Sequence, residues 1–311
     1  MKKFLLKVLL FFACVVVMDL AFGLFFSYLR AHAKGGSTAN CEYIANQATD
    51  DVIILGSSRA THHYVPQIIE DSLGVSCYNC GEEGNGVVLA YGRLKMLTNR
   101  YKPKLVLYEV TPRFDYGATD PNNKYLGYLR AYYDKKGIKE LFEDFDDDLS
   151  FIKMLSNMYQ NTGRLLPDLL DNIVLRDNNQ GYEPLYGKID VSKKKSSTKS
   201  KTDIVVDSLK LSYVEKIIQL CQAQDIPLLF MISPSVSLSE NVSSYEPEIT
   251  ICKKYGVPCY NYLEYQPITD NTDYFQDLSH LNNEGAVAFT QMLIKEVLYK
   301  YLAKGYNNSG S

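Results

Sequence analysis

The sequence predicts an α/β protein of three layers, in which helices cover both faces of a five-stranded parallel sheet. Three observations support this prediction. Short apolar runs alternate with segments of helical pattern along most of the chain. Roughly 90 residues separate the third and fourth runs, more than a connection inside a compact domain needs, so we expect a mostly helical insertion there. Residues 8–26 are apolar apart from Asp19, which predicts an N-terminal transmembrane helix.

The strand and helix signals follow one another in a regular order. After a buried run that ends in glycine comes a helical pattern, and this alternation implies right-handed crossovers between parallel strands. The predicted strands lie at 52–55, 76–79, 104–110, 226–233 and 258–262, and the predicted helices at 65–73, 87–99, 205–224, 248–255 and 284–302. The corresponding domain organisation is a membrane anchor or signal at 1–30, a linker at 31–50, an α/β domain at 51–303 with its insertion at about 112–203, and a flexible tail at 304–311.

The N-terminal segment has two interpretations. Three lysines, Lys2, Lys3 and Lys7, precede the apolar stretch, and this basic flank predicts a single-pass anchor with its N-terminus in the cytoplasm and the rest of the chain outside it. The alternative is a cleaved signal with secretion after cleavage near Ala33, because 31–33 has a small-x-small pattern. Asp19 is either a functional intramembrane carboxylate or one tolerated through helix packing or protonation.

Composition limits the class of function. The chain has 311 residues and a net charge of −3, with no concentrated basic face for nucleic acid. The one basic cluster, 192–201, is typical of a solvated loop. The insertion is rich in tyrosine, and its Tyr125, Tyr128, Tyr132 and Tyr133 either form its own core or stack on sugar rings. The acidic stretch at 143–148 lacks the ligand spacing of a calcium loop.

Cysteine usage predicts no cofactor. An exported domain permits disulfides, but the pairing of the six cysteines after Cys14 cannot be deduced from the sequence. Cys77 and Cys80 form a C-x-x-C without a second pair or nearby ligating histidines, which excludes a typical zinc site. We expect no metal.

A serine nucleophile with a histidine base is the chemistry that the remaining residues favour. Ligands of an open α/β sheet bind beyond the carboxyl ends of its strands, and the first strand is followed by Gly56, Ser57 and Ser58. The chain has four histidines. His32 lies at the membrane end. His62 and His63 lie on the same short segment as Ser58, where a base is poorly placed to reach the serine, so we interpret both as surface or core residues.

His280 remains, three residues after Asp277. An Asp-x-x-His turn can present a carboxylate to one imidazole nitrogen while the other nitrogen faces the serine. An incidental histidine before a helix is the alternative. The glycine-rich segment 81–86 and the backbone N–H of Ser58 are natural donors for an oxyanion.

These segments resemble the SGNH (GDSL-type) hydrolase superfamily. Gly56-Ser57-Ser58 is similar to its Gly-Asp-Ser block with serine in place of aspartate, 79–84 ("NCGEEG") is similar to its Asn-x-x-x-x-Gly block, and Asp277 with His280 matches its Asp-x-x-His. The resemblance implies a flavodoxin-like fold, with Ser58 as nucleophile and the N–H groups of Ser58 and Gly84 as oxyanion donors. The Gly-Ser-Ser variant is similar to membrane-anchored cell-envelope members, such as the teichoic acid D-alanyl transfer protein and polysaccharide O-acetylation proteins.

One block departs from the family pattern. After the third predicted strand the family has Gly-x-Asn-Asp, whereas this chain has "YEVTPRFDY" with Arg113 near the position of the asparagine. Arg113, Arg59 and Asn85 are therefore candidates for substrate or oxyanion contacts. For Arg59 an ion pair at a helix start is the simpler interpretation.

The resemblance implies an extracytoplasmic serine esterase or O-acyltransferase that acts on O-acyl groups, acetyl in the first instance, of a cell-envelope glycan. The expected partners are the acylated glycan, the membrane through the N-terminal helix, and a membrane acyltransferase, with no nucleic acid. The missing asparagine favours the alternative, a catalytically silent glycan-binding or assembly subunit that keeps the fold.

Overall fold

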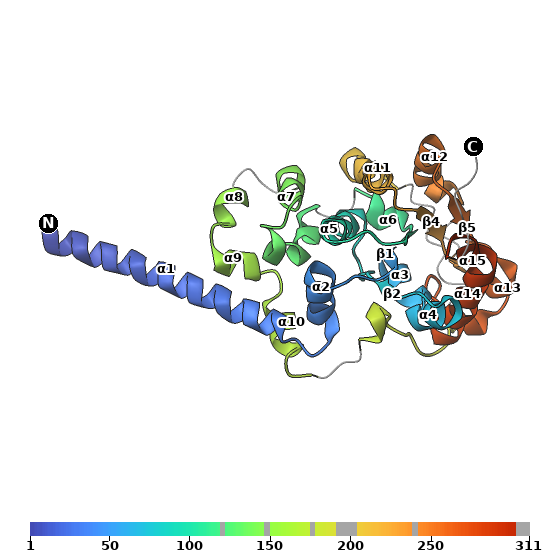
Figure 1. Cartoon of the computed structure of the whole chain (residues 1–311), viewed down its shortest axis with the longest axis horizontal. Helices are drawn as coiled ribbons and strands as arrows, with labels where there is room; N and C mark the ends of the chain where they lie inside the picture. The colour runs from blue at the N-terminus through green and yellow to red at the C-terminus, as the bar shows by residue number, and fades with distance from the viewer. Residues whose placement is uncertain (119–121, 146–149, 175–177, 191–203, 238–241, 303–311) are drawn as a thin grey trace. The chain divides into compact units, whose positions relative to one another are not determined.

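Five short apolar runs pair into one parallel sheet, because each is long enough to be buried and is flanked by turn residues. In the computed structural model, which describes residues 1–118, 122–145, 150–174, 178–190, 204–237 and 242–302, the chain divides into two compact units (Figure 1). We call Ala48–Pro121 with Asn179–Ser311 the sheet unit, and Met1–Gln47 with Asn122–Asn178 the helical unit.

The sheet has the strand order β2-β1-β3-β4-β5, and every neighbouring pair is parallel. Its strands are β1 Val52–Gly56, β2 Cys77–Asn79, β3 Leu105–Glu109, β4 Leu228–Ile232 and β5 Cys259–Asn261. This is the order of doubly wound, flavodoxin-like sheets. The predicted α/β fold with five parallel strands is therefore confirmed, and the strand positions differ from the prediction by one or two residues at their ends.

Alternate residues of the buried strands face opposite layers of helices. Val52 and Ile54 of β1 share one apolar core with Ile69 of α4 (Pro66–Leu73) and with Phe289 of α14 (Asn283–Leu293). The opposite face carries helices that pack on each other: α5 (Val87–Thr98) contacts α11 (Ser208–Ala223), which contacts α12 (Glu246–Tyr255). Figure 1 shows α11 and α12 on the other side of the strands from α4 and α14.

Shorter elements complete the sheet unit. They are α3 Ser58–His63, α6 Pro112–Asp115, η3 Asn179–Gly181, η5 Val242–Tyr245, α13 Gln266–Thr269, η6 Thr272–Tyr274, the π-helical turn η7 Ile294–Leu298 and α15 Tyr299–Leu302. The last predicted helix, 284–302, is thus one continuous helical stretch with a π turn inside it.

The sheet order locates the crevice where a ligand can enter. The chain leaves β1 toward β2 on one side and leaves β3 toward β4 on the other. The carboxyl ends of β1 and β3 therefore form the topological switch point of the sheet.

The helical unit combines the N-terminal segment with the insertion. Its elements are α1 Lys2–Ala31, α2 Gly36–Asn46, η1 Asn122–Tyr128, η2 Arg130–Tyr132, α7 Lys139–Phe145, α8 Ser150–Lys153, α9 Asn157–Asn161 and α10 Leu165–Leu170. The helix α1 is long and apolar enough to cross a membrane, and most of its surface is exposed.

Residues 36–46 differ from the prediction, because they form α2 instead of a polar linker. The helix buries Thr38, Cys41 and Ile44, which recur at intervals of three residues along one face. Its N-terminus is held by the insertion, since the Thr38 hydroxyl donates to the Asp168 carboxylate over 3.0 Å. This weakly apolar segment is helical because it packs against residues that lie more than a hundred positions away in the sequence.

Three of the four tyrosines singled out in the insertion are buried in its own core: Tyr125, Tyr132 and Tyr133. Tyr128 lies under the Arg164 guanidinium, 4.6 Å from the ring centroid. The structure therefore agrees with the interpretation that these tyrosines form the core of the insertion. The basic cluster at 192–201, the last half of the acidic stretch at 143–148 and the tail at 304–311 lie outside the described residues.

Candidate active site

The turn after β1 places two serines at the switch point. Gly56 has φ +142°, and a Cβ at this position would lie 2.6 Å from the carbonyl oxygen of Glu109 on β3. Only glycine permits this close approach of β1 and β3. Ser57 is then the N-cap of α3, and Ser58 is its first residue.

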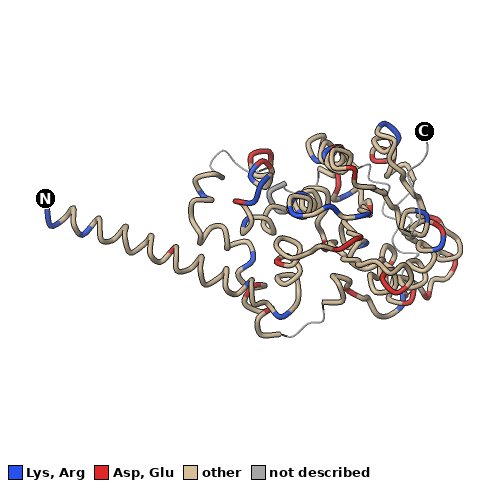
Figure 2. The backbone as a smooth tube through the Cα atoms, in the orientation of Figure 1, with Lys and Arg blue, Asp and Glu red and all other residues tan. Residues whose placement is uncertain are grey.

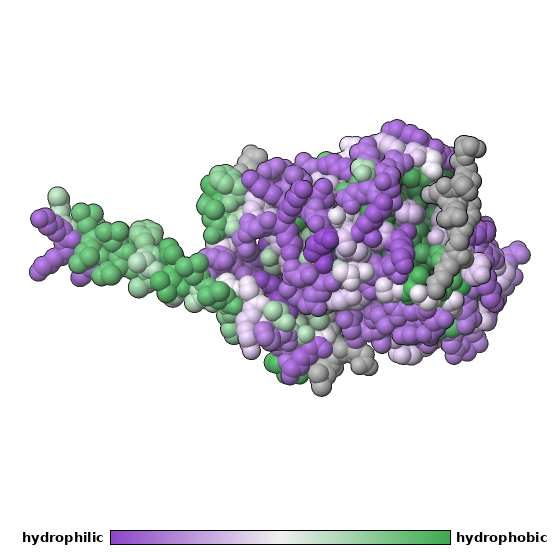
Figure 3. Space-filling model, viewed as in Figure 1, coloured by the Kyte–Doolittle hydropathy of each residue, from purple (hydrophilic) through white to green (hydrophobic). Residues whose placement is uncertain are grey.

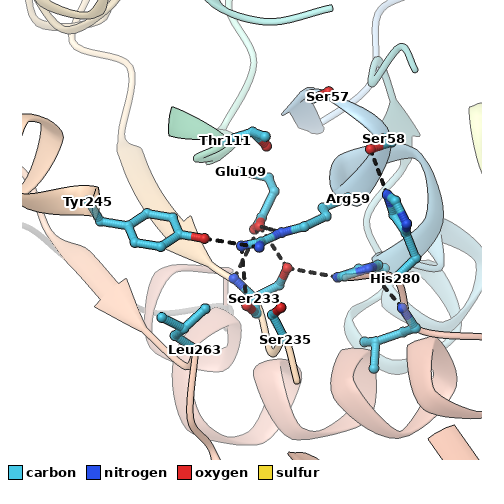
Figure 4. A network of polar contacts seen from close by, with 12 residues as sticks. Ser57, Ser58, Arg59, Glu109, Thr111, Ser233, Ser235, Tyr245, Leu263 and His280 are labelled. Carbon is cyan, nitrogen blue, oxygen red and sulfur yellow. Dashed lines mark hydrogen bonds and ion pairs between the residues drawn. The ribbon is translucent and has the colours of Figure 1, made fainter. Parts of the chain in front are cut away.

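The structure brings together the three residues expected to form a catalytic triad. The Ser58 Oγ lies 2.8 Å from Nε2 of His280, although 222 positions separate them in sequence (Figure 4). On the other side of the ring, Nδ1 of His280 lies 2.9 Å from Oδ2 of Asp277. A carboxylate at Nδ1 requires a proton on that nitrogen, which leaves Nε2 free to accept the serine proton.

A tight turn fixes the histidine. The turn is closed by an antiparallel bridge between Phe275 and Leu281. Inside it, Oδ1 of Asp277 accepts the backbone N–H groups of Ser279 (2.8 Å) and His280 (2.9 Å). Burial raises the pKa of Asp277, but these hydrogen bonds and the imidazole outweigh burial, so its pKa lies below the ordinary value. The carboxylate thus stays ionised while it orients the ring.

His63 links α3 to this turn. Its Nε2 accepts the backbone N–H of Leu281 over 3.0 Å, so its Nδ1 carries the proton and donates to Oγ of Ser233 over 2.7 Å. Burial, followed by the charges of Arg59 and the neighbouring histidines, lowers the pKa of His63 well below its ordinary value. His63 is a buried, neutral connector between α3, the end of β4 and the residue next to His280.

Arg59 forms a buried ion pair, as the simpler of its two interpretations required. Its Nε lies 3.0 Å from Oε1 of Glu109, and the two side chains are almost fully buried. The same guanidinium donates to the Tyr245 hydroxyl over 3.0 Å and to the Ser233 carbonyl over 3.3 Å (Figure 4). These contacts engage the donors of Arg59 inside the protein and give it a structural role, and its candidate role as a substrate contact stays a prediction.

Glu109 is the buried acidic partner of Arg59, and the sequence did not single it out. Burial raises its pKa, an effect that Arg59 and the hydrogen bonds of Ser233 oppose. Its carboxylate also accepts the Tyr64 hydroxyl. The available signal was a carboxylate inside the apolar run "KLVLYEV", since a charge in a buried strand needs a partner.

His62 joins the glycine-rich loop to α3. Its Nε2 lies 2.6 Å from the Glu83 carboxylate and its Nδ1 lies 2.6 Å from the carbonyl oxygen of Glu183. Both ring nitrogens face acceptors, an arrangement that favours the doubly protonated ring. Burial lowers the pKa of His62, but the hydrogen bond to Glu83 and the other contacts outweigh it, so the pKa lies above its ordinary value. The ring centroid lies 5.9 Å from that of His280.

The loop after β2 is further held by Arg93 on α5. This nearly buried side chain donates to the carbonyl oxygens of Cys80 (2.8 Å) and Gly81 (3.1 Å) and pairs with Glu82. Gly84 has φ +64° in this loop. The Asn85 Nδ2 donates to the Glu83 carbonyl, and its Oδ1 is buried without a hydrogen-bond partner among the described residues.

Arg113 is not placed in the triad by any described contact. It lies on α6, exposed to solvent, with its guanidinium 5.6 Å from the centroid of the Phe114 ring. Thr111 directly follows the end of β3 as the N-cap of α6. Its hydroxyl is buried, and within the described ranges it has no hydrogen-bond partner.

Neither a metal cluster nor a disulfide bond is found at this site. Among the residues described, no group of three or more His, Cys, Asp or Glu side chains is arranged to hold a metal ion. Cys77 and Cys80 form no disulfide bond with each other.

Comparison with known proteins assigns this chain to no family. No family model and no curated protein match the sequence. Among solved structures, the chain is similar to BT4096, a gut microbial diltiazem-metabolizing enzyme, with 10% sequence identity and a TM-score of 0.38. The match covers 79% of this chain and 46% of that chain, so this chain spans about half the length of that enzyme. A likeness at this level does not extend to activity. The sheet and the site define the class: a doubly wound α/β protein with a serine, a histidine and an aspartate hydrogen-bonded in series at its switch point.

Proposed function

We propose that the chain is a serine esterase or O-acyltransferase with Ser58 as nucleophile, His280 as general base and Asp277 as the residue that orients the base. One observation carries this proposal: hydrogen-bond distances of 2.8 Å and 2.9 Å join Ser58 to His280 and His280 to Asp277. A serine activated by a positioned imidazole attacks acyl carbonyls.

The proposed reaction has two halves. Ser58 Oγ attacks the acyl carbonyl and gives its proton to Nε2 of His280, and the imidazolium then protonates the departing alcohol oxygen. His280 then deprotonates a second hydroxyl, which attacks the acyl-serine; the bond between the acyl carbon and Ser58 Oγ breaks, and the imidazolium returns its proton to Oγ. Water as the second nucleophile makes the protein an esterase, and a sugar hydroxyl makes it a transferase.

The oxyanion needs donors that do not move during the reaction. The N–H of Ser58 lies in the first turn of α3, where no helical acceptor exists. Gly84 is the second proposed donor, and its loop is held from two directions by Arg93 and by the His62–Glu83 pair. Asn85 and Arg113 remain candidate substrate contacts.

The proposed setting is the outer face of a membrane, with α1 as a retained anchor and the lysines at its start in the cytoplasm. The packing of α1 against the insertion supports retention, because Asp19 accepts a hydrogen bond from Ser156 over 2.6 Å. The proposed substrate is an O-acylated, in the first instance acetylated, cell-envelope glycan. An anchor beside a membrane-bound acyl donor, and so beside a membrane acyltransferase, favours transfer over hydrolysis.

The test uses the full chain in detergent, with p-nitrophenyl acetate as substrate and a fluorophosphonate as serine label. Ser58→Ala and His280→Ala should each lower turnover by about 1,000-fold or more, and Ser58→Ala should abolish labelling. Ser57→Ala is the matched control, since the neighbouring Ser57 hydroxyl has no partner in the described part of the chain.

Two results would contradict the proposal. Wild-type turnover in both triad variants would exclude the triad. An unlabelled and inactive wild-type protein would favour the catalytically silent glycan-binding subunit instead.

A further inference from the structure

Large apolar side chains lie exposed along the insertion between residues 151 and 174. Leu155 is 77% exposed and Ile173 is 75% exposed, which is unusual for side chains of this size in contact with water. The full set in this stretch is Phe151, Ile152, Leu155, Met158, Leu166, Leu169, Leu170, Ile173 and Val174. Figure 3 shows the corresponding apolar surface on α1 and at the place of α8.

Three charged side chains of the same stretch are buried, while Lys153 is half-buried and Thr162 is exposed. Asp168 is 1% exposed although its neighbours on the short helix α10 are exposed leucines, and Arg164 and Asp171 are buried as well. Arg164 donates to the Ser37 hydroxyl over 2.6 Å, and the Asp171 carboxylate accepts the N–H of Thr38 over 3.0 Å. Charged groups inside and leucines outside are the reverse of a water-facing surface, and they match a surface surrounded by hydrocarbon.

One face of α1 packs against this stretch. Asp19, Gly23, Phe26 and Arg30 are spaced by four, three and four residues, so they lie along one side of the helix. Gly23 allows close approach, since a Cβ there would lie 2.6 Å from Asn157. Arg30 hydrogen-bonds Asn161 and lies 3.8 Å from Asp168.

The contacts of Asp19 determine beside which part of α1 the insertion lies. Asp19 accepts the Ser156 hydroxyl (2.6 Å) and the backbone N–H groups of Asn157 and Met158 (2.9 Å each) at the start of α9. Figure 2 shows acidic colour part-way along α1, away from the basic colour at the N-terminus. With a rise of 1.5 Å per residue, Asp19 lies about 16 Å along α1 from Val8, roughly half the hydrocarbon thickness of about 30 Å.

If α1 spans the membrane, the start of α9 therefore lies at the same depth as Asp19. The donors of α9 satisfy a carboxylate that would otherwise be costly in hydrocarbon. A segment at that depth also needs an apolar outer surface, and residues 151–174 have one.

We propose that residues 151–174 are embedded in the membrane beside α1, with their exposed apolar side chains in contact with lipid acyl chains. This inference rests on the proposed membrane anchorage of α1, and it adds that the insertion is part of the membrane-embedded structure. The catalytic chemistry proposed for the sheet unit does not enter it.

The chain contains no tryptophan, so a single introduced tryptophan is a clean reporter. We would reconstitute the full chain in phosphatidylcholine vesicles and compare emission with and without bromine on the acyl chains. Leu155→Trp reports the insertion, Phe12→Trp reports α1, and Tyr299→Trp, at an exposed position of the sheet unit, is the control. All three positions are exposed, so the substitutions should not disturb folding.

The expected result is that bromine quenches Leu155→Trp to the same extent as Phe12→Trp and leaves Tyr299→Trp unchanged. Quenching of Phe12→Trp without quenching of Leu155→Trp would overturn the proposal while keeping the anchor, and a blue-shifted emission in that case would indicate a protein partner instead of lipid. Quenching of neither would overturn the anchor together with the proposal. Turnover of p-nitrophenyl acetate by the same samples reports the proposed activity separately.

Discussion

Three histidines lie around the candidate site, and their hydrogen-bond partners differ. His62 faces two acceptors, which favours its doubly protonated form, whereas His63 accepts a backbone N–H, which requires an unprotonated ring nitrogen. His280 faces a hydroxyl on one side and a carboxylate on the other. Adjacent residues of one short helix thus have opposite electrostatic roles, one holding an acidic loop and the other a backbone turn.

The His62–Glu83 pair should make stability depend on pH. The pKa of His62 is raised above its ordinary 6.5, so its contribution is fully present below pH 6.5 and is lost as pH rises through the folded-state pKa. The pKa of Glu83 is lowered from 4.5, chiefly by His62, so its contribution is present above pH 4.5. Glu83→Gln should therefore destabilise the protein most between these values, by about 1 kcal/mol or less because Glu83 is partly exposed.

Melting temperatures of wild type and Glu83→Gln from pH 5 to pH 9 would measure this effect. The control is Glu82→Gln, whose partner Arg93 stays charged throughout this range. The difference caused by Glu83→Gln should shrink at high pH, and the difference caused by Glu82→Gln should not. A Glu83→Gln difference that is constant with pH would contradict the proposed charge state of His62.

At the scale of elements, α3 organises the site although it has only six residues. Ser58 contacts the histidine turn, Arg59 pairs with β3, and His63 reaches both the end of β4 and Leu281. Successive side chains of a helix point about 100° apart, so one short helix can reach several neighbouring segments. The position of Ser58 is therefore fixed by contacts that its neighbours make.

We expect His63→Phe to weaken both stability and turnover. It leaves the Leu281 N–H and the Ser233 hydroxyl without their partner, which costs about 1–3 kcal/mol. Because Leu281 follows His280, kcat should fall while KM changes little. His63→Gln, which supplies both a donor and an acceptor, should recover part of the turnover. Equal kcat in wild type and His63→Phe would show that the connector does not position the base.

The packing of α1 gives a second prediction for elements. Gly23→Leu forces a side chain into Asn157 and should destabilise the helical unit by about 1–3 kcal/mol. Ala21→Leu, on an exposed part of the same helix, is the control and should be neutral. Limited proteolysis of the full chain in detergent would compare cleavage within residues 151–174. Equal protection in both variants would contradict the packing of α1 on this stretch.

The strands, and the meeting of Ser58 with His280 and Asp277, were predictable because their signals are local or scarce. A strand such as 52–55 can be predicted from its own continuous apolar run, without knowing which strands it pairs with. The chain has four histidines, which leaves few choices for a catalytic base. The Arg59–Glu109 pair was not predictable as such, since fifty positions separate its members and either could have faced solvent. The helix α2 was missed for the same reason, because its polar partners lie in the insertion.

At the scale of the whole molecule, the division of the chain into two units indicates whether the N-terminal helix is retained or cleaved. The helical unit is made of two stretches, Met1–Gln47 and Asn122–Asn178, and α1 supplies partners to the second one. Cleavage near Ala33 would remove Asp19 and Arg30, leaving the start of α9 and the buried Asp168 without them. These contacts favour the retained helix over a cleaved signal.

We therefore expect the mature protein to keep α1. The measurement is the intact mass of the protein isolated from membranes, together with its resistance to extraction at alkaline pH. The mass should include residues 1–33, and the protein should stay with the membrane after extraction. Asp19→Leu is the informative variant: because it keeps the helix apolar but removes the acceptor of the α9 N–H groups, it should remain in the membrane while residues 151–174 become more sensitive to protease. A mature chain that begins near Lys34 and is released to the soluble fraction would contradict the anchor, and unchanged protection in Asp19→Leu would show that this carboxylate does not hold the insertion.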